Sequence, residues 1–140
     1  MPANYEFNID HGVIEVSGWD LVTLGDLNDY LAEVSSSPNN LGNAIEYIDF
    51  GEATDINICQ LGALQIASSY EKLIDRGIRG SVIYAPSDRV YEAAKTMIAT
   101  FVAVGGELPN GYRLTRTPVA IKDVPAYLLA SPAFEPRLVA

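Results

Sequence analysis

Hydrophobic and polar residues alternate along the chain with two different periods, and the changes of period mark the predicted elements. A two-residue period over residues 5–9 and an apolar run at 13–16 predict two strands. The turn signal Asp10-His11-Gly12 lies between them and indicates a β-hairpin. Three further apolar runs predict strands at 44–50, 81–85 and 112–117.

Stretches with a period of about 3.6 residues separate these strands and predict helices. Thr23 and Asp26 resemble a capping box at the start of the first helix, and a second helix is expected over 57–76. The alternation predicts an α/β fold with a mixed, mainly parallel five-stranded sheet, an N-terminal β-hairpin and about four helices. We expect one domain over residues 1–130, followed by an irregular C-terminal tail at 131–140.

The amino-acid composition excludes several kinds of chemical site. The 140 residues include one Cys and one His, which excludes an intramolecular disulfide and a Cys-based metal site. No apolar run approaches the roughly 20 residues of a membrane-spanning helix, and the N-terminus has no signal-peptide pattern. We therefore expect no metal, no cofactor, no membrane span and a cytoplasmic location.

Charge is distributed unevenly between the two halves of the chain. The formal net charge is -9, and residues 1–71 contain twelve acidic residues and no Lys or Arg. Such a half repels phosphate backbones, so we expect no nucleic-acid partner. The acidic residues either keep the protein in solution or form a surface that meets a basic partner.

Catalytic signatures are missing from the sequence. There is no phosphate-binding glycine loop and no nucleophile elbow, and His11 lies in the predicted hairpin turn. Asp49 ends a predicted strand, as phospho-accepting aspartates do, but the acidic pair and Lys of a receiver domain are lacking. We expect Asp49 to accept backbone hydrogen bonds from a polar turn at residues 51–55. An enzyme using Asp49, Asp55 and Cys59 would lack a visible base–nucleophile pair, so the sequence predicts a protein that is not an enzyme.

The most specific pattern is the segment from Asp49 to Leu64, which reads DFGEATDINICQLGAL. It resembles the signature of STAS domains, named for sulfate transporters and anti-sigma factor antagonists. In that family a strand ends in Asp, and a loop leads to Asp-Ser-Ser-Gly-Leu-Gly at the start of a helix. The strand and helix units before and after this segment follow in the family's order, and the chain is similar to stage II sporulation protein AA. Four signature positions carry other residues here: Asn57, Ile58, Cys59 and Gln60.

The resemblance implies a regulatory protein–protein interaction module similar to an anti-sigma factor antagonist. Cys59 occupies the position of the Ser that is phosphorylated in the antagonists, so the resemblance implies binding without phosphorylation there. The implied docking surface is a loop at 50–60 with the start of the following helix. Its candidate contact residues are Asp49, Thr54, Asp55, Asn57, Ile58, Cys59, Gln60 and, from a loop after the second strand, Trp19.

The implied partner is a regulatory protein similar to an anti-sigma kinase, or a second copy of the chain. The alternative is a small apolar ligand or lipid carried by the same fold, because residues 90–104 are apolar on more than one helical face. A thiol at a helix N-terminus can be redox-active, but we expect Cys59 to be a small buried apolar side chain. Trp19 fits a core position and an interface position equally well.

Overall fold

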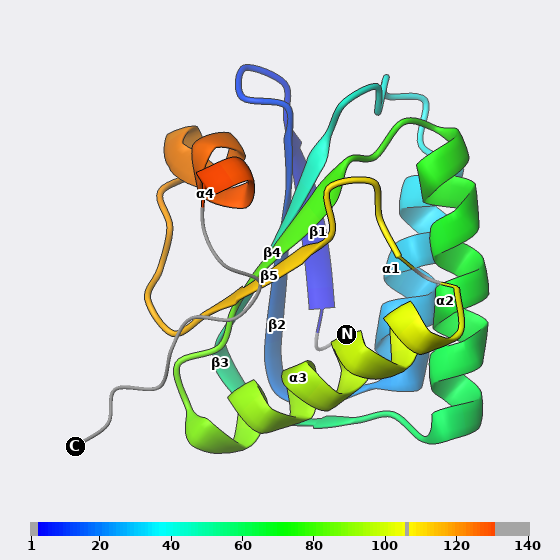
Figure 1. Ribbon diagram of the computed structural model, residues 1–140, viewed down its shortest axis with the longest axis vertical. Coiled ribbons are helices and arrows are strands. Elements are labelled where there is room, and N and C mark those ends of the chain that lie inside the picture. Colours follow the sequence, from blue (N-terminus) through cyan, green and yellow to red (C-terminus); the bar gives the residue numbers. More distant parts are fainter. Residues whose placement is uncertain (1–2, 106, 131–140) are drawn as a thin grey trace.

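The structure, a computed structural model, describes residues 3–105 and 107–130. The predicted tail at 131–140 lies outside these residues. A five-stranded sheet forms the centre of the molecule, with helices on both of its faces (Figure 1). In chain order the elements are β1 (Ala3–Asn8), β2 (Val13–Thr23), α1 (Leu24–Ser35), β3 (Ile45–Asn57), α2 (Gln60–Asp75), β4 (Gly80–Tyr84), α3 (Asp88–Ala103), β5 (Tyr112–Thr115), the short 3-10 helix η1 (Ile121–Asp123) and α4 (Val124–Ala130).

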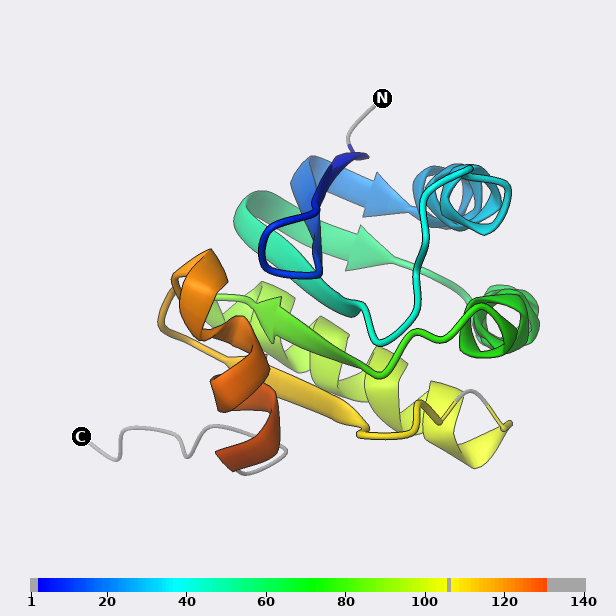
Figure 2. The same ribbon diagram turned by 90° about the horizontal axis from the view of Figure 1, so that it is seen from above.

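The predicted fold class is confirmed. The strand order is β1-β2-β3-β4-β5, with β1 antiparallel to β2 and all other pairs parallel. Because each crossover advances by one strand in the same direction, right-handed connections place α1, α2 and α3 on one face. The short helix α4 covers part of the opposite face, as the view from above shows (Figure 2).

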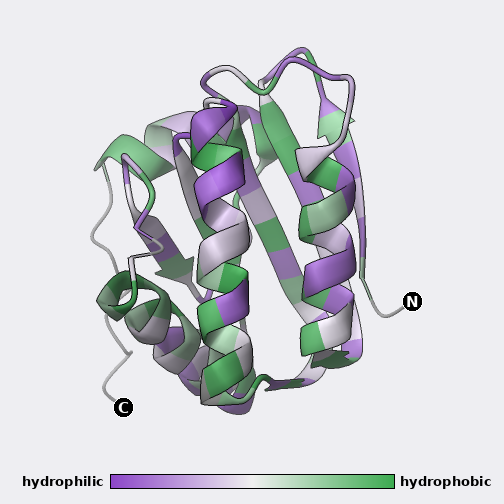
Figure 3. Ribbon diagram, turned by 90° about the vertical axis from the view of Figure 1, so that its right-hand side faces the viewer, coloured by the Kyte–Doolittle hydropathy of each residue, from purple (hydrophilic) through white to green (hydrophobic). Residues whose placement is uncertain are grey.

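Two apolar clusters hold the layers together. The larger one lies between the sheet and α1–α3, and it includes Ile48, Phe50 and Ile83 from the strands. The smaller one joins α4 to the other face through Val124 and Leu128, which pack against Val13, Ile45, Tyr47 and Val82. α1 and α2 lie side by side, with apolar and polar residues interspersed along both (Figure 3). Such mixed patterning is typical of helices with one buried face.

The helix starts follow local capping chemistry. Thr23 and Asp26 form the predicted capping box: the Thr23 backbone N–H donates to Asp26 Oδ2 at 2.8 Å, and Asp26 N–H donates to Thr23 Oγ1 at 3.4 Å. Ser87 caps α3 in the same way, because its hydroxyl accepts a hydrogen bond from the Val90 N–H.

Two strands are longer than the sequence predicted, so the expected turn at 51–55 and the loop position of Trp19 are wrong. β2 continues to Thr23 and β3 to Asn57, and the two pair with each other beyond the end of β4. Two register shifts bend this ribbon, one on each side of the Trp19–Asp20 step. Polar residues in the segment suggested a turn, but the bulges let Ala53 and Ile56 remain buried while their neighbours face solvent.

Candidate functional site

The candidate contact residues lie around the carboxyl end of β3 and the start of α2. They are not on a loop, as expected, because residues 50–57 are part of β3 and only Ile58 and Cys59 connect it to α2. Trp19 lies on β2 directly beside Glu52 of β3 and is half-buried, which is intermediate between the two positions that the sequence left open. The candidate residues thus lie at one end of the sheet, and most of them belong to the paired strands β2 and β3 instead of to a loop.

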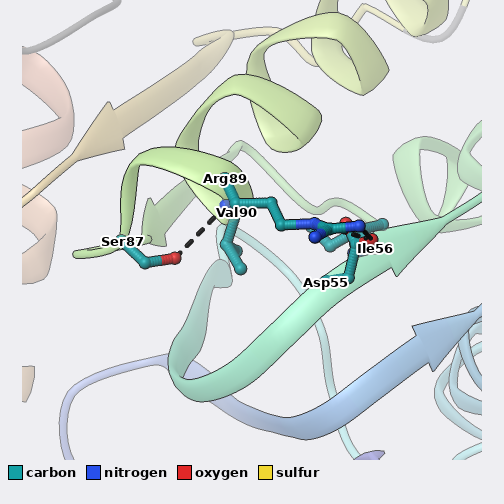
Figure 4. A network of polar contacts seen from close by, with 5 residues as sticks. All are labelled: Asp55, Ile56, Ser87, Arg89 and Val90. Carbon is teal, nitrogen blue, oxygen red and sulfur yellow. Dashed lines mark hydrogen bonds and ion pairs between the residues drawn. The ribbon is translucent and has the colours of Figure 1, made fainter.

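The two candidate aspartates are engaged in local hydrogen bonds. Asp49 Oδ1 accepts the hydrogen bond expected of it, from the Gly51 N–H at 2.7 Å, although Gly51 lies within β3 and not in a turn. Asp55 Oδ1 accepts from the Ile56 N–H at 2.8 Å, and its Oδ2 lies 2.8 Å from Arg89 Nη2 in an ion pair (Figure 4). The hydrogen bond from Arg89, with that from Ile56, lowers the pKa of the Asp55 carboxyl.

Cys59 is exposed, which corrects the expectation of a small buried side chain. It is the N-cap of α2: its backbone is extended, and its Sγ accepts a hydrogen bond from the Gly62 N–H at 3.3 Å. An N-cap residue must leave the helical path to offer its side chain to the first turn, which places the thiol at the surface. Gln60 is the first residue of α2.

The remaining candidate residues differ in how exposed their side chains are. Thr54 and Asn57 are exposed, and Ile58 is half-buried. Ile58 lines an open hollow of about 530 Å³ between the end of β3, α2 and α3. Ile56, Ala63, Ala93 and Met97 add to its apolar part, and Glu92, Thr96 and Thr100 line the rest. The hollow therefore adjoins the start of α2, where Cys59 lies.

Exposed apolar side chains gather at the same end of the molecule. Leu61 and Leu64, in the first two turns of α2, are 67% and 43% exposed, and Leu21 near the end of β2 is 44% exposed. Single exposed leucines are common, but Leu61 and Leu64 share a helix with Ala63 of the hollow, and two exposed leucines so close to it indicate a surface suited to binding. The sequence does not single out Leu61 and Leu64, because both fit the apolar period of the helix expected over 57–76, which does not tell an exposed leucine from a buried one.

A buried carboxylate was also missed. Glu46, the second residue of β3, is 0% exposed and lies under α1 and α2. Its Oε1 accepts hydrogen bonds from Tyr70 and Ser81, each at 2.8 Å, and its Oε2 accepts one from the Tyr30 hydroxyl. Burial raises the pKa of the Glu46 carboxyl, and the hydrogen bonds from the three hydroxyl groups oppose that rise.

The signal for Glu46 was present in the sequence. A central parallel strand is buried on both faces, so a Glu within the apolar run AIEYI must find hydrogen-bond donors inside the protein. The helix positions of Tyr30 and Tyr70 could not be connected to it without the three-dimensional arrangement. The cluster joins α1, α2, β3 and β4.

Asp49, Asp55 and Cys59, the residues of the enzyme alternative, each interact with a different neighbouring residue. Asp49 binds Gly51, Asp55 binds Arg89, and the Cys59 thiol accepts from Gly62; no hydrogen bond between any two of the three is recorded within the described part of the chain. In residues 3–105 and 107–130, no three His, Cys, Asp or Glu side chains gather closely enough to hold a metal ion. None of the described helices is both long enough and apolar enough to cross a membrane.

Comparison with protein-family models, curated proteins and solved structures finds no significant match to this chain.

Proposed function

We propose that this chain is a regulatory protein–protein interaction module, similar to an anti-sigma factor antagonist of the STAS family, that acts in the cytoplasm without an enzymatic step. The observation that carries the proposal is the exposed apolar surface at the start of α2. We define this docking surface by Cys59, Leu61 and Leu64 with the hollow beside them. The buried centre of a protein–protein interface is more apolar than its rim, and an exposed apolar surface of this kind can form such a centre.

The charge around this surface supports a basic partner. Residues 1–71 contribute twelve acidic and no basic residues, and they include β1, β2, β3 and α1. Asp55 is paired with Arg89, whereas Asp20 and Glu52 on the neighbouring ribbon are exposed. Complementary charge raises the association rate and is screened by salt, so the complex should form more slowly as ionic strength increases.

The position of Cys59 supports constitutive binding over a phosphorylation switch. A thiol does not offer a protein-serine kinase its usual hydroxyl acceptor, and here it is exposed at the N-cap of α2, beside Leu61 in the sequence. A negative charge at this atom would have to be buried among apolar groups when the partner binds. An uncompensated buried charge destabilises a contact by several kcal/mol.

The test compares three proteins in affinity capture from host lysate, read by mass spectrometry. The wild type is set beside Cys59→Asp and the matched control Cys59→Asn. Asp and Asn are both good N-caps, so both variants should fold, and only Asp adds charge. We expect one protein partner to be retained by the wild type and by Cys59→Asn, and to bind Cys59→Asp at least about tenfold more weakly.

The second candidate function is a carrier of a small apolar ligand, and the apolar part of the hollow favours it. Val102 and Val104 near the end of α3 are exposed, which adds apolar surface on that helix. A carrier would release a small molecule in native mass spectra of all three proteins. It would show no protein partner that distinguishes Cys59→Asp from Cys59→Asn.

A further inference from the structure

The outer edge of β1 is open. β1 is the first strand in the sheet order, so within the described residues only its inner edge pairs with a strand (Figure 2). Residues 3–8 pair with β2 in unbroken register, and they contain neither Pro nor Lys. Natural edge strands are usually protected by such residues, by bulges or by being very short. β1 is six residues long and has no bulge; its one charged residue is the exposed Glu6, and Pro2 precedes the strand in the sequence.

The opposite edge of the sheet differs. β5 has only four residues and is bracketed by Pro109 and Pro118. The Gly111 carbonyl accepts a hydrogen bond from Ser81 of β4, and the Thr115 carbonyl accepts one from Ala85 just after β4. The alternation of a strand therefore turns the Tyr112 carbonyl outward. Arg113 Nη1 donates to that carbonyl at 2.9 Å. The β5 edge is thus short and has a carbonyl group that Arg113 covers, whereas the β1 edge is longer and unbroken.

The two faces of β1 have different chemistry. Tyr5 and Phe7 face the helices and are partly buried, and the Tyr5 ring lies edge-on to Tyr30 with their centroids 5.7 Å apart. Glu6 faces the other way and lies directly opposite Glu15 of β2. Like charges in this position are destabilising. None of the ion pairs found among the described residues includes either carboxylate.

A hollow of mixed polarity lies at the hairpin end of the same strand. It has a volume of about 340 Å³; Phe7, Ile9 and Ala44 form its apolar part, and Asn39 and Asn40 contribute polar side chains. Ile9, the residue after β1, is 76% exposed. An additional strand along β1 would therefore find apolar surface on one face and two uncompensated carboxylates on the other.

We propose that the outer edge of β1 binds an extended segment of a partner protein as a sixth strand, and that this segment alternates apolar residues with Lys or Arg. Its backbone would pair with β1, its apolar side chains would contact Phe7 and Ile9, and its cations would lie beside Glu6 and Glu15. Main-chain pairing supplies affinity in this mode, and alternate side chains supply specificity. A second copy is a poorer occupant, because it would bring another net charge of -9 and another Glu6 to the contact.

This inference is independent of the proposed function, because it uses a different surface. β1 contributes none of the residues that define the docking surface at the start of α2. The variant Cys59→Asp should leave strand addition unchanged, and changes at Glu6 should leave the α2 surface unchanged. Failure of one proposal can therefore be recognised without affecting the other.

The test uses two synthetic peptides of about the length of β1, one alternating Val and Lys and the other alternating Val and Glu. Binding is followed by NMR, with hydrogen exchange of the backbone amides of residues 3–8. We expect the Val/Lys peptide to bind and to slow exchange in β1, and the Val/Glu peptide not to bind. Glu6→Gln should weaken binding by up to about fivefold, and Glu6→Lys should weaken it further. Glu71→Lys, an exposed change on α2, is the matched control and should bind the peptide far better than Glu6→Lys.

Glu6 is exposed, so the variants should fold, which an unchanged circular dichroism spectrum would verify. Three results would overturn the proposal. The two peptides could bind equally well, or the Val/Lys peptide could bind without slowing exchange in β1. Alternatively, sedimentation could show a dimer of the wild type in which β1 amides are already protected, which would identify a second copy as the occupant.

Discussion

The buried carboxyl of Glu46 makes the stability of this protein depend on pH in a way that two substitutions can isolate. It is fully buried, and its recorded partners are three neutral hydroxyl groups, from Tyr30, Tyr70 and Ser81. Burial raises the pKa of Glu46 in the folded state. The folded protein therefore binds this proton more tightly than the unfolded chain does.

The direction of the pH dependence follows from this difference in pKa between the folded and unfolded states. The contribution of Glu46 to the free energy of unfolding is fully present below its unfolded pKa, and it is lost as pH rises through the raised folded pKa. Glu46→Gln keeps the shape of the side chain and removes the titration. The stability of Glu46→Gln relative to wild type should therefore rise with pH above about 4.5 and become constant above the folded pKa.

A second substitution measures how much one hydrogen bond to Glu46 contributes to the free energy of unfolding. Tyr70→Phe removes one donor to Glu46 Oε1 and leaves the aromatic ring in place. A hydrogen bond to a charged group contributes about 1.5–3 kcal/mol, and one between neutral groups about 0.5–1.5 kcal/mol. We expect Tyr70→Phe to cost about 2 kcal/mol where Glu46 is ionised and about 1 kcal/mol where it is protonated. For a chain of this size the larger value lowers Tm by roughly 8 °C.

Urea unfolding of the wild type and variants between pH 4 and pH 8 measures both effects, because a difference between variants cancels the titration of the other carboxylates. Tyr47→Phe is the control, since the Tyr47 hydroxyl accepts from the Val119 N–H at 3.1 Å and has no hydrogen bond to Glu46 among those recorded. Its cost should not change over this pH range. A stability difference between Glu46→Gln and wild type that is flat, or that falls as pH rises, would refute the reasoning.

Two further predictions concern packing and the end of α1. Gly18→Ala should cost about 1–3 kcal/mol in thermal unfolding, because the added Cβ would lie 2.8 Å from a ring carbon of the buried Phe50. Gly62→Ala, whose Cβ would approach the flexible Leu24 side chain at 2.7 Å, should be near neutral; equal costs at the two positions would contradict the argument. Arg76→Ala removes three hydrogen bonds to carbonyl groups at or just after the end of α1, at 2.7–3.0 Å. It should lower the urea midpoint by the equivalent of about 1–3 kcal/mol, and Arg76→Lys should recover only part of this loss.

The element order could be predicted from the sequence because it depends on local signals. Apolar runs, the Thr23–Asp26 capping box and the turn signal Asp10-His11-Gly12 each act within a few residues. The bulged continuation of β2 and β3 could not be predicted in this way. Residues 51–55 are rich in turn-forming types, and only the pairing of β3 with β2 keeps them extended.

The place of the candidate residues in the fold was predicted, but their local structure was not. The sequence placed them where a strand leads into a helix, and they lie from β3 to the start of α2. Their role in binding stays a prediction. The exposure of Cys59 depends on its role as an N-cap, which a lone Cys does not indicate by its residue type. Glu46 and its hydroxyl donors lie up to 35 positions apart in the chain, so their cluster depends on tertiary packing alone.

The most direct test of the central claim is whether a charge at Cys59, without a change in fold, removes a protein partner. Capture with the wild type, Cys59→Asn and Cys59→Asp, read for proteins and small molecules together, makes this measurement. The account predicts a protein partner that the first two retain and that Cys59→Asp loses by about tenfold or more. A co-purifying small molecule with all three proteins, and no protein that distinguishes them, would contradict it and support the carrier.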